Sequence, residues 1–340
     1  MYSELHFLVD FLCAAAMFGI FIPGKSGYLW ILIYNFCAFA LQMPFGVLLD
    51  MLDGCGKKHS AAEYTVLLGV LLTVAGTFSH PVILGIGNAL FHVGGGVATI
   101  REDYAGHFQG TGLGIFVAPG AFGLYIGTLL SKAGWCVQSR AVGILLVCIL
   151  TGLLLAVGQE SRWESCGYEE NETAVPSKYG FLCLICLGVV ILRSYVGMAV
   201  AFPWKNTLAA GVLCVSAVVL GKIAGGFFAA GIGMKRAVCS SLAAAAFCYV
   251  LSDVEVFGVL SLFFFNMSMP MTLYLLVREY RKLAGFAFGL LTFGLFLGFL
   301  PVYFATGNPL DGRLTGCLGS IVSLVFLYWG VKRSYVDVSM

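Results

Sequence analysis

Apolar stretches separated by short polar breaks follow one another along this chain. Each stretch approaches the length of about 20 residues that a helix needs to cross the hydrocarbon core of a bilayer. Twelve such stretches are predicted as helices, at residues 4–22, 28–49, 62–79, 81–100, 107–130, 139–158, 179–203, 207–230, 236–252, 255–277, 284–306 and 313–331. The pattern predicts an all-α polytopic membrane protein with twelve transmembrane helices.

The longest polar break, Gln159–Ser177, is acidic and lies between the sixth and seventh stretches. It predicts an N-terminal six-helix bundle at 1–158, a linker loop at 159–177 and a C-terminal six-helix bundle at 178–340. The first apolar stretch runs into Pro23-Gly24 and then into a second stretch, so we interpret it as a helix rather than a cleaved signal peptide.

Composition supports a membrane location. Of the 340 residues, 60% are hydrophobic and 11% are charged, whereas soluble domains carry roughly a quarter charged residues. We find no Walker-type phosphate loop, no nucleic-acid-binding pattern and no nucleophile–base pair, and we therefore expect neither an enzyme nor a cofactor. Most of the twelve cysteines lie in or beside apolar stretches, so we expect them to fill helix packing rather than bind metal or form disulfides.

Basic residues predict the orientation, because cytoplasmic loops of membrane proteins are enriched in lysine and arginine. With the N-terminus inside, twelve of the nineteen basic residues lie inside: Lys57, Lys58, Arg101, Arg162, Lys178, Lys235, Arg236, Arg278, Arg281, Lys282, Lys332 and Arg333. Five lie outside: Lys25, Lys132, Arg140, Lys205 and Arg313. Both termini are therefore predicted to be cytoplasmic, and the compact loops favour a bacterial inner membrane.

Short motifs recur between the two predicted bundles at offsets of 177 to 180 residues. Four pairs carry the repeat: Ala105-Gly106-x-x-x-Gly110 with Ala284-Gly285-x-x-x-Gly289, Arg101-Glu102 with Arg278-Glu279, Gly46 with Gly226, and Asn88 with Asn266. Parallel six-helix repeats are the architecture of one class of secondary transporter.

The segment Gly46–Gly54, followed by Lys57-Lys58, resembles the loop signature between the second and third helices of the major facilitator superfamily. Gly46 and Asp50 match that signature, whereas Asp53 stands where a second glycine is expected. The segments His6–Phe11 and Ala89–His92 resemble, more narrowly, fosmidomycin-resistance-type exporters. The resemblance implies a twelve-helix fold that works by alternating access, usually as a monomer.

A further motif, Gly114-x-x-x-Ala118-Pro119-Gly120-x-x-Gly123, resembles in part the proline-glycine signature of antiporters in the same superfamily. The proline is expected to kink its helix, and the glycines allow close helix packing. The motif favours export over uptake.

In this superfamily the first helix of each three-helix unit lines the central cavity, and here those helices carry Asp10, His92, Arg193 and Asn266. Ionisable residues inside spans are costly and usually face a cavity, which points to the same positions. We predict that His92, Arg193, Asn266 and Asn88 bind substrate.

Asp10 is the predicted proton-coupling residue, and the alternative is a solvated aspartate near the cytoplasmic interface. His6 lies one helical turn earlier and could tune Asp10, although we favour an interfacial position for it. Arg193 cannot lose its proton, so it requires an anionic substrate or a structural ion pair, for example with Asp10. His92 serves either as a ligand or as a hydrogen-bonded structural residue, and the role of Lys222 stays open.

Three charged residues at predicted cytoplasmic helix ends, Asp50, Arg101 and Glu102, are expected to act in gating. By resemblance, contacts of the Asp50 loop lock the outward-facing state.

These features predict a secondary active transporter that moves a small polar or anionic organic solute, coupled to protons and directed outward. One alternative is a metal-ion exporter that uses Asp10, His6, His92 and the sulfurs of Met267, Met269 and Met271, although packing is the favoured role of these methionines. A second alternative is a membrane receptor or scaffold of the same fold that does not transport.

Overall fold

The structure is a computed structural model that describes residues 2–24, 26–53, 61–105, 110–135, 144, 152, 180–305 and 311–336. The first part of the chain forms α1 (Tyr2–Ala16), η1 (Met17–Phe21), α2 (Gly27–Asn35), η2 (Phe36–Ala40), α3 (Gln42–Asp53), α4 (Ala61–Phe78), α5 (Pro81–Ala105), α6 (Thr111–Val117) and α7 (Pro119–Lys132). The second part forms α9 (Gly180–Ala199), α10 (Leu208–Ile232), α11 (Met234–Val250), α12 (Glu255–Asn266), α13 (Ser268–Glu279), η5 (Arg281–Leu283), α14 (Ala284–Phe304) and α15 (Gly312–Val336).

Ten spans in the described residues are long and apolar enough to cross a membrane. Each coincides with one of the twelve predicted stretches, and α11 supplies an eleventh helix of 17 residues at the stretch predicted for 236–252. The stretch predicted for 139–158 and the linker 159–177 fall almost entirely outside the described residues, so the predicted bundle boundaries stay predictions.

Two of the spans break near a proline, and the break at Pro119 was predicted. Pro119 has no N–H to donate, and α6 ends at Val117 while α7 begins at Pro119. Near Pro270 the span divides at Met267 into α12 and α13. Such breaks leave backbone carbonyls without an intrahelical partner inside the protein, where a side chain can donate a hydrogen bond to them.

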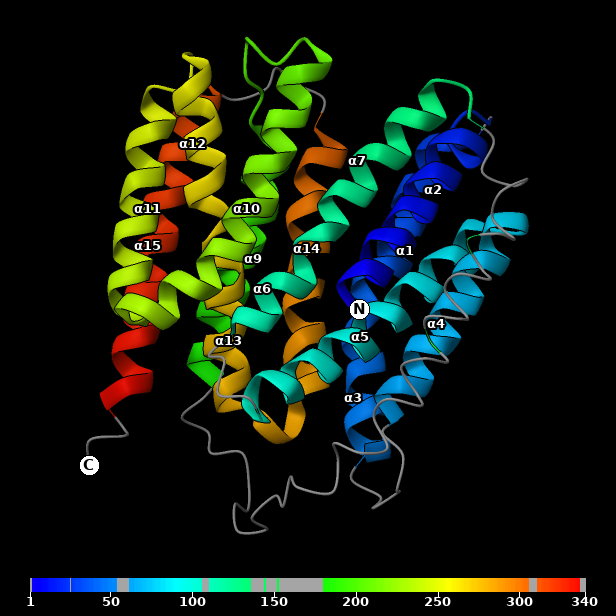
Figure 1. Cartoon of the computed structure of the whole chain (residues 1–340), viewed down its shortest axis with the longest axis horizontal. Coiled ribbons are helices and arrows are strands. Elements are labelled where there is room, and N and C mark those ends of the chain that lie inside the picture. Colours follow the sequence, from blue (N-terminus) through cyan, green and yellow to red (C-terminus); the bar gives the residue numbers. More distant parts are fainter. Residues whose placement is uncertain are drawn as a thin grey trace.

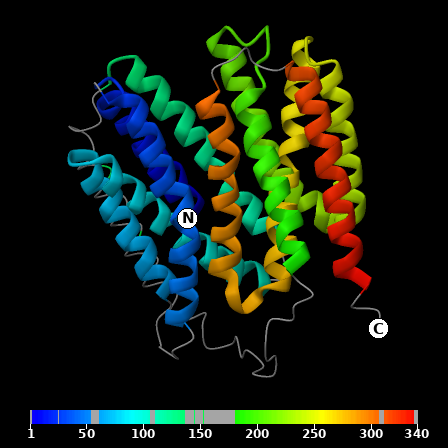
Figure 2. The ribbon, with the colours of Figure 1, turned by 180° about the vertical axis from the view of Figure 1, so that it is seen from behind.

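The helices form two groups side by side, α1 to α7 and α9 to α15 (Figure 1). The same division is visible from behind, where α14 lies between the groups (Figure 2). Several pairs join the groups: α14 packs on α3, η2 and α5, α10 packs on α6 and α7, and α13 packs on α6. The repeated glycines permit the α3–α14 and α6–α10 contacts, since a Cβ on Gly46 would overlap the carbonyl of Gly285 and one on Gly226 would crowd the carbonyl of Gly110.

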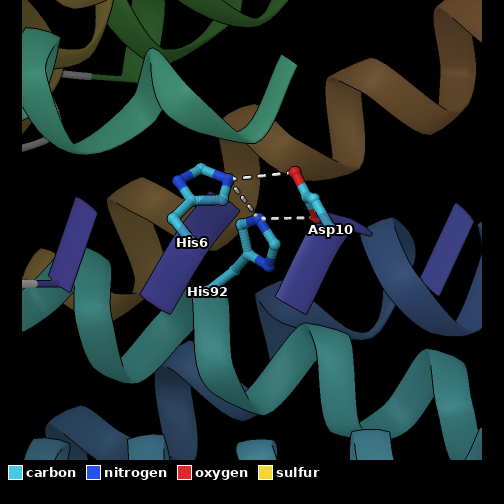
Figure 3. Close-up of side chains that lie close together, drawn as sticks. All are labelled: His6, Asp10 and His92. Carbon is cyan, nitrogen blue, oxygen red and sulfur yellow. Dashed lines mark hydrogen bonds and ion pairs between the residues drawn. The ribbon is translucent and has the colours of Figure 1, made fainter. Parts of the chain in front are cut away.

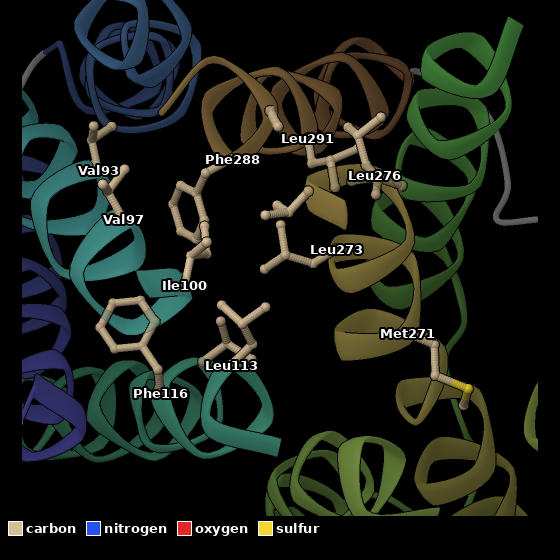
Figure 4. Close-up of a cluster of buried hydrophobic side chains, with 14 of the residues drawn as sticks. Val93, Val97, Ile100, Leu113, Phe116, Met271, Leu273, Leu276, Phe288 and Leu291 are labelled. Atoms are coloured by element: carbon tan, nitrogen blue, oxygen red, sulfur yellow. The ribbon is translucent and has the colours of Figure 1, made fainter. Parts of the chain in front are cut away.

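A buried apolar cluster fills the space between the groups on the predicted cytoplasmic side (Figure 4). Each of four helices supplies two or more of its members: Val93, Val97 and Ile100 from α5, Leu113 and Phe116 from α6, Leu273 and Leu276 from α13, and Phe288 and Leu291 from α14. At the opposite end Tyr28 and Tyr303 stack and exchange hydrogen bonds, each hydroxyl donating 2.7 Å to the other residue's carbonyl.

Helix α1 begins inside the molecule rather than at its surface. Tyr2 is only 6% exposed, and the start of α1 lies well above the lower ends of α3 and α13 (Figure 1). Residues one or two turns into α1 are therefore deep in the protein, and His6 and Asp10 are both buried.

Candidate functional site

Two pairs of residues spaced four apart bring four polar side chains together inside the first group of helices. His6 and Asp10 lie on one face of α1, and Asn88 and His92 on one face of α5 (Figure 3). All four are buried, with exposed fractions of 5%, 7%, 2% and 8% in that order. The interfacial position favoured for His6 is therefore wrong, because α1 starts deeper than its sequence alone indicates.

The four side chains form one network of hydrogen bonds and ion-pair contacts. His6 Nε2 lies 3.2 Å from Asp10 Oδ2, and His92 Nε2 lies 3.7 Å from Asp10 Oδ1. The Asn88 amide donates to Asp10 Oδ1 at 3.1 Å and to Cys13 Sγ at 3.4 Å. The two imidazoles approach each other directly, with 2.8 Å between His6 Nε2 and His92 Nε2.

The outer nitrogens of the two rings fix where the protons are. His6 Nδ1 lies 2.7 Å from the carbonyl oxygen of Phe116, and His92 Nδ1 lies 2.8 Å from that of Asn88. A carbonyl only accepts, so both Nδ1 atoms must carry hydrogen. Two bare Nε2 lone pairs would repel at 2.8 Å, and one Nε2 must therefore carry hydrogen too. The pair then holds one positive charge, which the carboxylate of Asp10 balances.

These side chains also have the donor types of a metal site. One ligand atom each from His6, Asp10 and His92 lies within 4.8 Å of the others. Two nitrogens bound tetrahedrally to zinc at about 2.0–2.1 Å would lie about 3.3 Å apart. The 2.8 Å observed is the length of a hydrogen bond and is shorter than the spacing of two nitrogens in a tetrahedral zinc site.

Small and aromatic neighbours hold the network in place. Gly120 of α7 packs so closely that a Cβ there would overlap His6 Nε2 and Asp10 Oδ2. The His6 ring also packs on Phe116, with 4.9 Å between ring centroids, and His92 packs edge-on against Phe91 at 5.4 Å. The network thus lies directly against the apolar cluster, of which Phe116 is a member.

The break before Pro119 joins this network to the second group of helices. Ala121, whose N–H would ordinarily reach Val117, donates instead to Ala118 O at 3.3 Å. The Val117 carbonyl accepts from Lys222 Nζ of α10 at 3.1 Å. Adjacent carbonyls of α6 therefore hold His6 of one group and Lys222 of the other.

Arg193 lies on the inward face of α9. It follows Cys186 by seven residues and Val189 by four, and both of these are fully buried. Its Nε is buried and has no hydrogen-bond partner among the described residues, and no ion pair joins it to Asp10. The structural pairing with Asp10 is therefore not formed, and Lys222 lies near enough to interact electrostatically with both Arg193 and Asp10.

Asn266 is not part of the hydrogen-bond network. Its amide donates at 2.8 Å to Leu262 of its own helix, and its Cβ lies beside Gly221 of α10, next to Lys222.

Of the residues predicted for gating, Asp50 has the most specific position. Its carboxylate accepts from the amides of Gly285 and Phe286, both at 2.8 Å, and so caps the first turn of α14 from the other group of helices. Arg101 is half-buried and Glu102 is exposed near the end of α5.

Sequence reasoning overlooked a second cap of the same kind. Asp103 accepts from the amides of Gly112 and Leu113 at 2.8 and 2.9 Å and caps α6. The signal available was an acidic residue shortly before a predicted helix start.

No protein-family model and no curated protein matches the chain. Among solved structures it is similar to the major facilitator superfamily transporter FucP in the outward conformation, with a TM-score of 0.64 at 13% identity over 96% of this chain and 98% of that one. It is also similar to a single-substitution variant of the E. coli fucose:proton symporter FucP, with a TM-score of 0.60 at 14% identity over the same shares. The fold is therefore that of the major facilitator superfamily, as predicted.

Proposed function

We propose that this protein is a proton-coupled secondary active transporter that moves a small polar or anionic organic solute by alternating access. The observation that carries the proposal is the His6–His92 pair, whose Nε2 atoms lie 2.8 Å apart beside the Asp10 carboxylate inside the bundle. The fold supports transport, because its members carry solutes between two groups of helices.

In this mechanism the imidazole pair holds the coupled proton and Asp10 supplies the balancing negative charge. Loss of the proton leaves the buried carboxylate uncompensated, which is costly in a low-dielectric interior. The proton therefore leaves only when water or a cationic group reaches the site. Lys222 is one group able to act in this way, since it interacts electrostatically with both Asp10 and His92.

The substrate site proposed here lies between the two groups of helices and uses His92, Asn88, Arg193 and Asn266. Asp50, Arg101 and Glu102 are proposed to gate it from the cytoplasmic side. We also propose outward transport, cytoplasmic termini and a monomer in a bacterial inner membrane. The support for export is the Ala118-Pro119-Gly120 segment, which resembles in part the antiporter signature and whose Gly120 packs on His6 and Asp10.

The test is proton movement in proteoliposomes that contain the full chain and a trapped pH-sensitive dye. Addition of an organic anion to one side is expected to move protons in the wild type. Asp10→Asn and His92→Gln should each abolish this movement, whereas His80→Gln, at an exposed histidine, should leave it intact. Transport by Asp10→Asn with unchanged pH dependence would refute the coupling role.

The same preparation separates the alternatives. A receptor or scaffold binds a solute without any flux. For a metal-ion exporter, calorimetry with Zn²⁺ should show binding near one ion per chain that His92→Gln removes. The proposed carrier of organic solutes predicts no such binding.

A further inference from the structure

Two basic side chains from the second group of helices lie near each other inside the protein, and neither forms an ion pair with a described carboxylate. Arg193 of α9 and Lys222 of α10 interact electrostatically with each other. No hydrogen bond or ion pair joins Arg193 to another described residue, and the bond to the Val117 carbonyl satisfies one of the three donors of Lys222. Like charges held together in a low-dielectric interior destabilise it unless an anion joins them.

Asp10, Asp50 and Asp103 already have other partners. The shared proton of His6 and His92 balances Asp10, so that network is neutral. Asp50 and Asp103 each accept two backbone amides at helix starts. Among the described residues, no ion pair therefore balances the charges of Arg193 and Lys222.

Both side chains are partly exposed. Arg193 and Lys222 keep intermediate exposure although residues beside them on the same helices, such as Ser194 and Gly221, are buried. Guanidinium offers a planar fork that pairs with two oxygens of one acidic group, and the lysine ammonium adds a mobile point charge. Together they suit a ligand with two negative charges a short distance apart.

We infer that Arg193 and Lys222 form a binding site for a small organic dianion, either a dicarboxylate or a phosphate monoester. This inference rests on the proposed function, since it names the substrate class of the same transporter, and it adds Lys222 to the residues that bind substrate. Before the anion binds, the ammonium of Lys222 donates to the carbonyl of Val117.

The experiment measures thermal stabilisation of the purified full-length protein by ligands matched in size. Succinate is compared with succinamate, which carries one charge fewer, and methyl phosphate with dimethyl phosphate. A ligand that binds the folded state raises its melting temperature. We expect the dianion of at least one pair to stabilise the protein and its monoanionic counterpart to do so much less, and the pair that responds identifies the acidic group.

Arg193→Gln and Lys222→Gln should each weaken dianion binding by about 10- to 100-fold, the effect of removing a hydrogen bond to a charged group. Arg193→Lys should recover part of the loss, and Lys205→Gln, at an exposed lysine between α9 and α10, should match the wild type.

Equal stabilisation by dianion and monoanion in both pairs, no stabilisation by either dianion, or unchanged binding in both glutamine variants would overturn the inference. Its failure is distinct from failure of the proposed function. Proton-coupled movement of a neutral or singly charged solute would leave the function standing, whereas dianion binding without proton movement would leave only the site.

Discussion

At the scale of single side chains, His6, Asp10, Asn88 and His92 form the buried polar network to which we assign proton coupling. Sequence alone identified Asp10, Asn88 and His92, because polar groups inside an apolar span are costly and usually functional. It did not place His6, whose burial depends on how deep α1 begins. Lys222 was not assigned a role, because its partner is a carbonyl that becomes free only through the break before Pro119.

Gly120→Ala tests whether the network needs its close neighbour. The added Cβ would overlap the tips of His6 and Asp10, which can swing aside without moving either backbone. We therefore expect a folded protein whose proton movement falls to the level of His92→Gln.

Gly231→Ala, at a helical glycine with no atom within 4 Å of its added Cβ, is the matched control. It should keep full activity and gain up to about 1 kcal/mol of stability. Normal proton coupling in Gly120→Ala would argue against the hydrogen shared by the two imidazoles.

At the scale of helices, a carboxylate from one helix caps the first turn of another. Asp50 of α3 caps α14, and Asp103 of α5 caps α6. The sequence indicated that Asp50 acts in gating, but it did not identify the partner, because the pairing joins residues more than 230 positions apart. The kink at Pro119 was predictable, since the chemistry of proline determines it locally.

Asp50→Ala removes both acceptors from the first turn of α14. Loss of a helix cap typically costs about 0.5–2 kcal/mol, so we expect a lower melting temperature and faster hydrogen exchange at Gly285 and Phe286. Asp50→Asn should lose much less, because asparagine is also a good cap. Equal effects of the two substitutions would show that the negative charge matters more than the cap.

For the whole molecule, the repeated glycines predicted two parallel halves, and the fold bears this out. The sequence did not reveal that Gly46 and Gly226 would pack against the opposite half. A repeat shows that two segments have similar structures, but it does not show what each segment contacts. Contacts close the space between the groups at both ends, by the glycine pairs and apolar cluster at one and by Tyr28 with Tyr303 at the other.

Gly46→Ala should push α3 away from α14, since its Cβ would overlap the backbone of Gly285. We expect hydrogen exchange to rise at the start of α14, while the end near Tyr303 stays protected or becomes more so. Mass spectrometry of deuterated peptides measures both ends in one experiment. A uniform rise along the chain would instead indicate general unfolding, and Gly231→Ala again provides the reference.

The neighbouring carbonyls of Phe116 and Val117 connect the proposed proton site, through His6, with the proposed anion site, through Lys222. An arriving anion that draws Lys222 away leaves the Val117 oxygen bare, and an unmet acceptor in the interior costs about 1–3 kcal/mol. A rotation of the α6–α7 junction would give the Val117 oxygen a new partner and remove this cost. The same rotation would move the Phe116 oxygen, which orients His6. Anion binding in one group of helices would thus change the position of an imidazole in the other group, through the two neighbouring carbonyls of Phe116 and Val117.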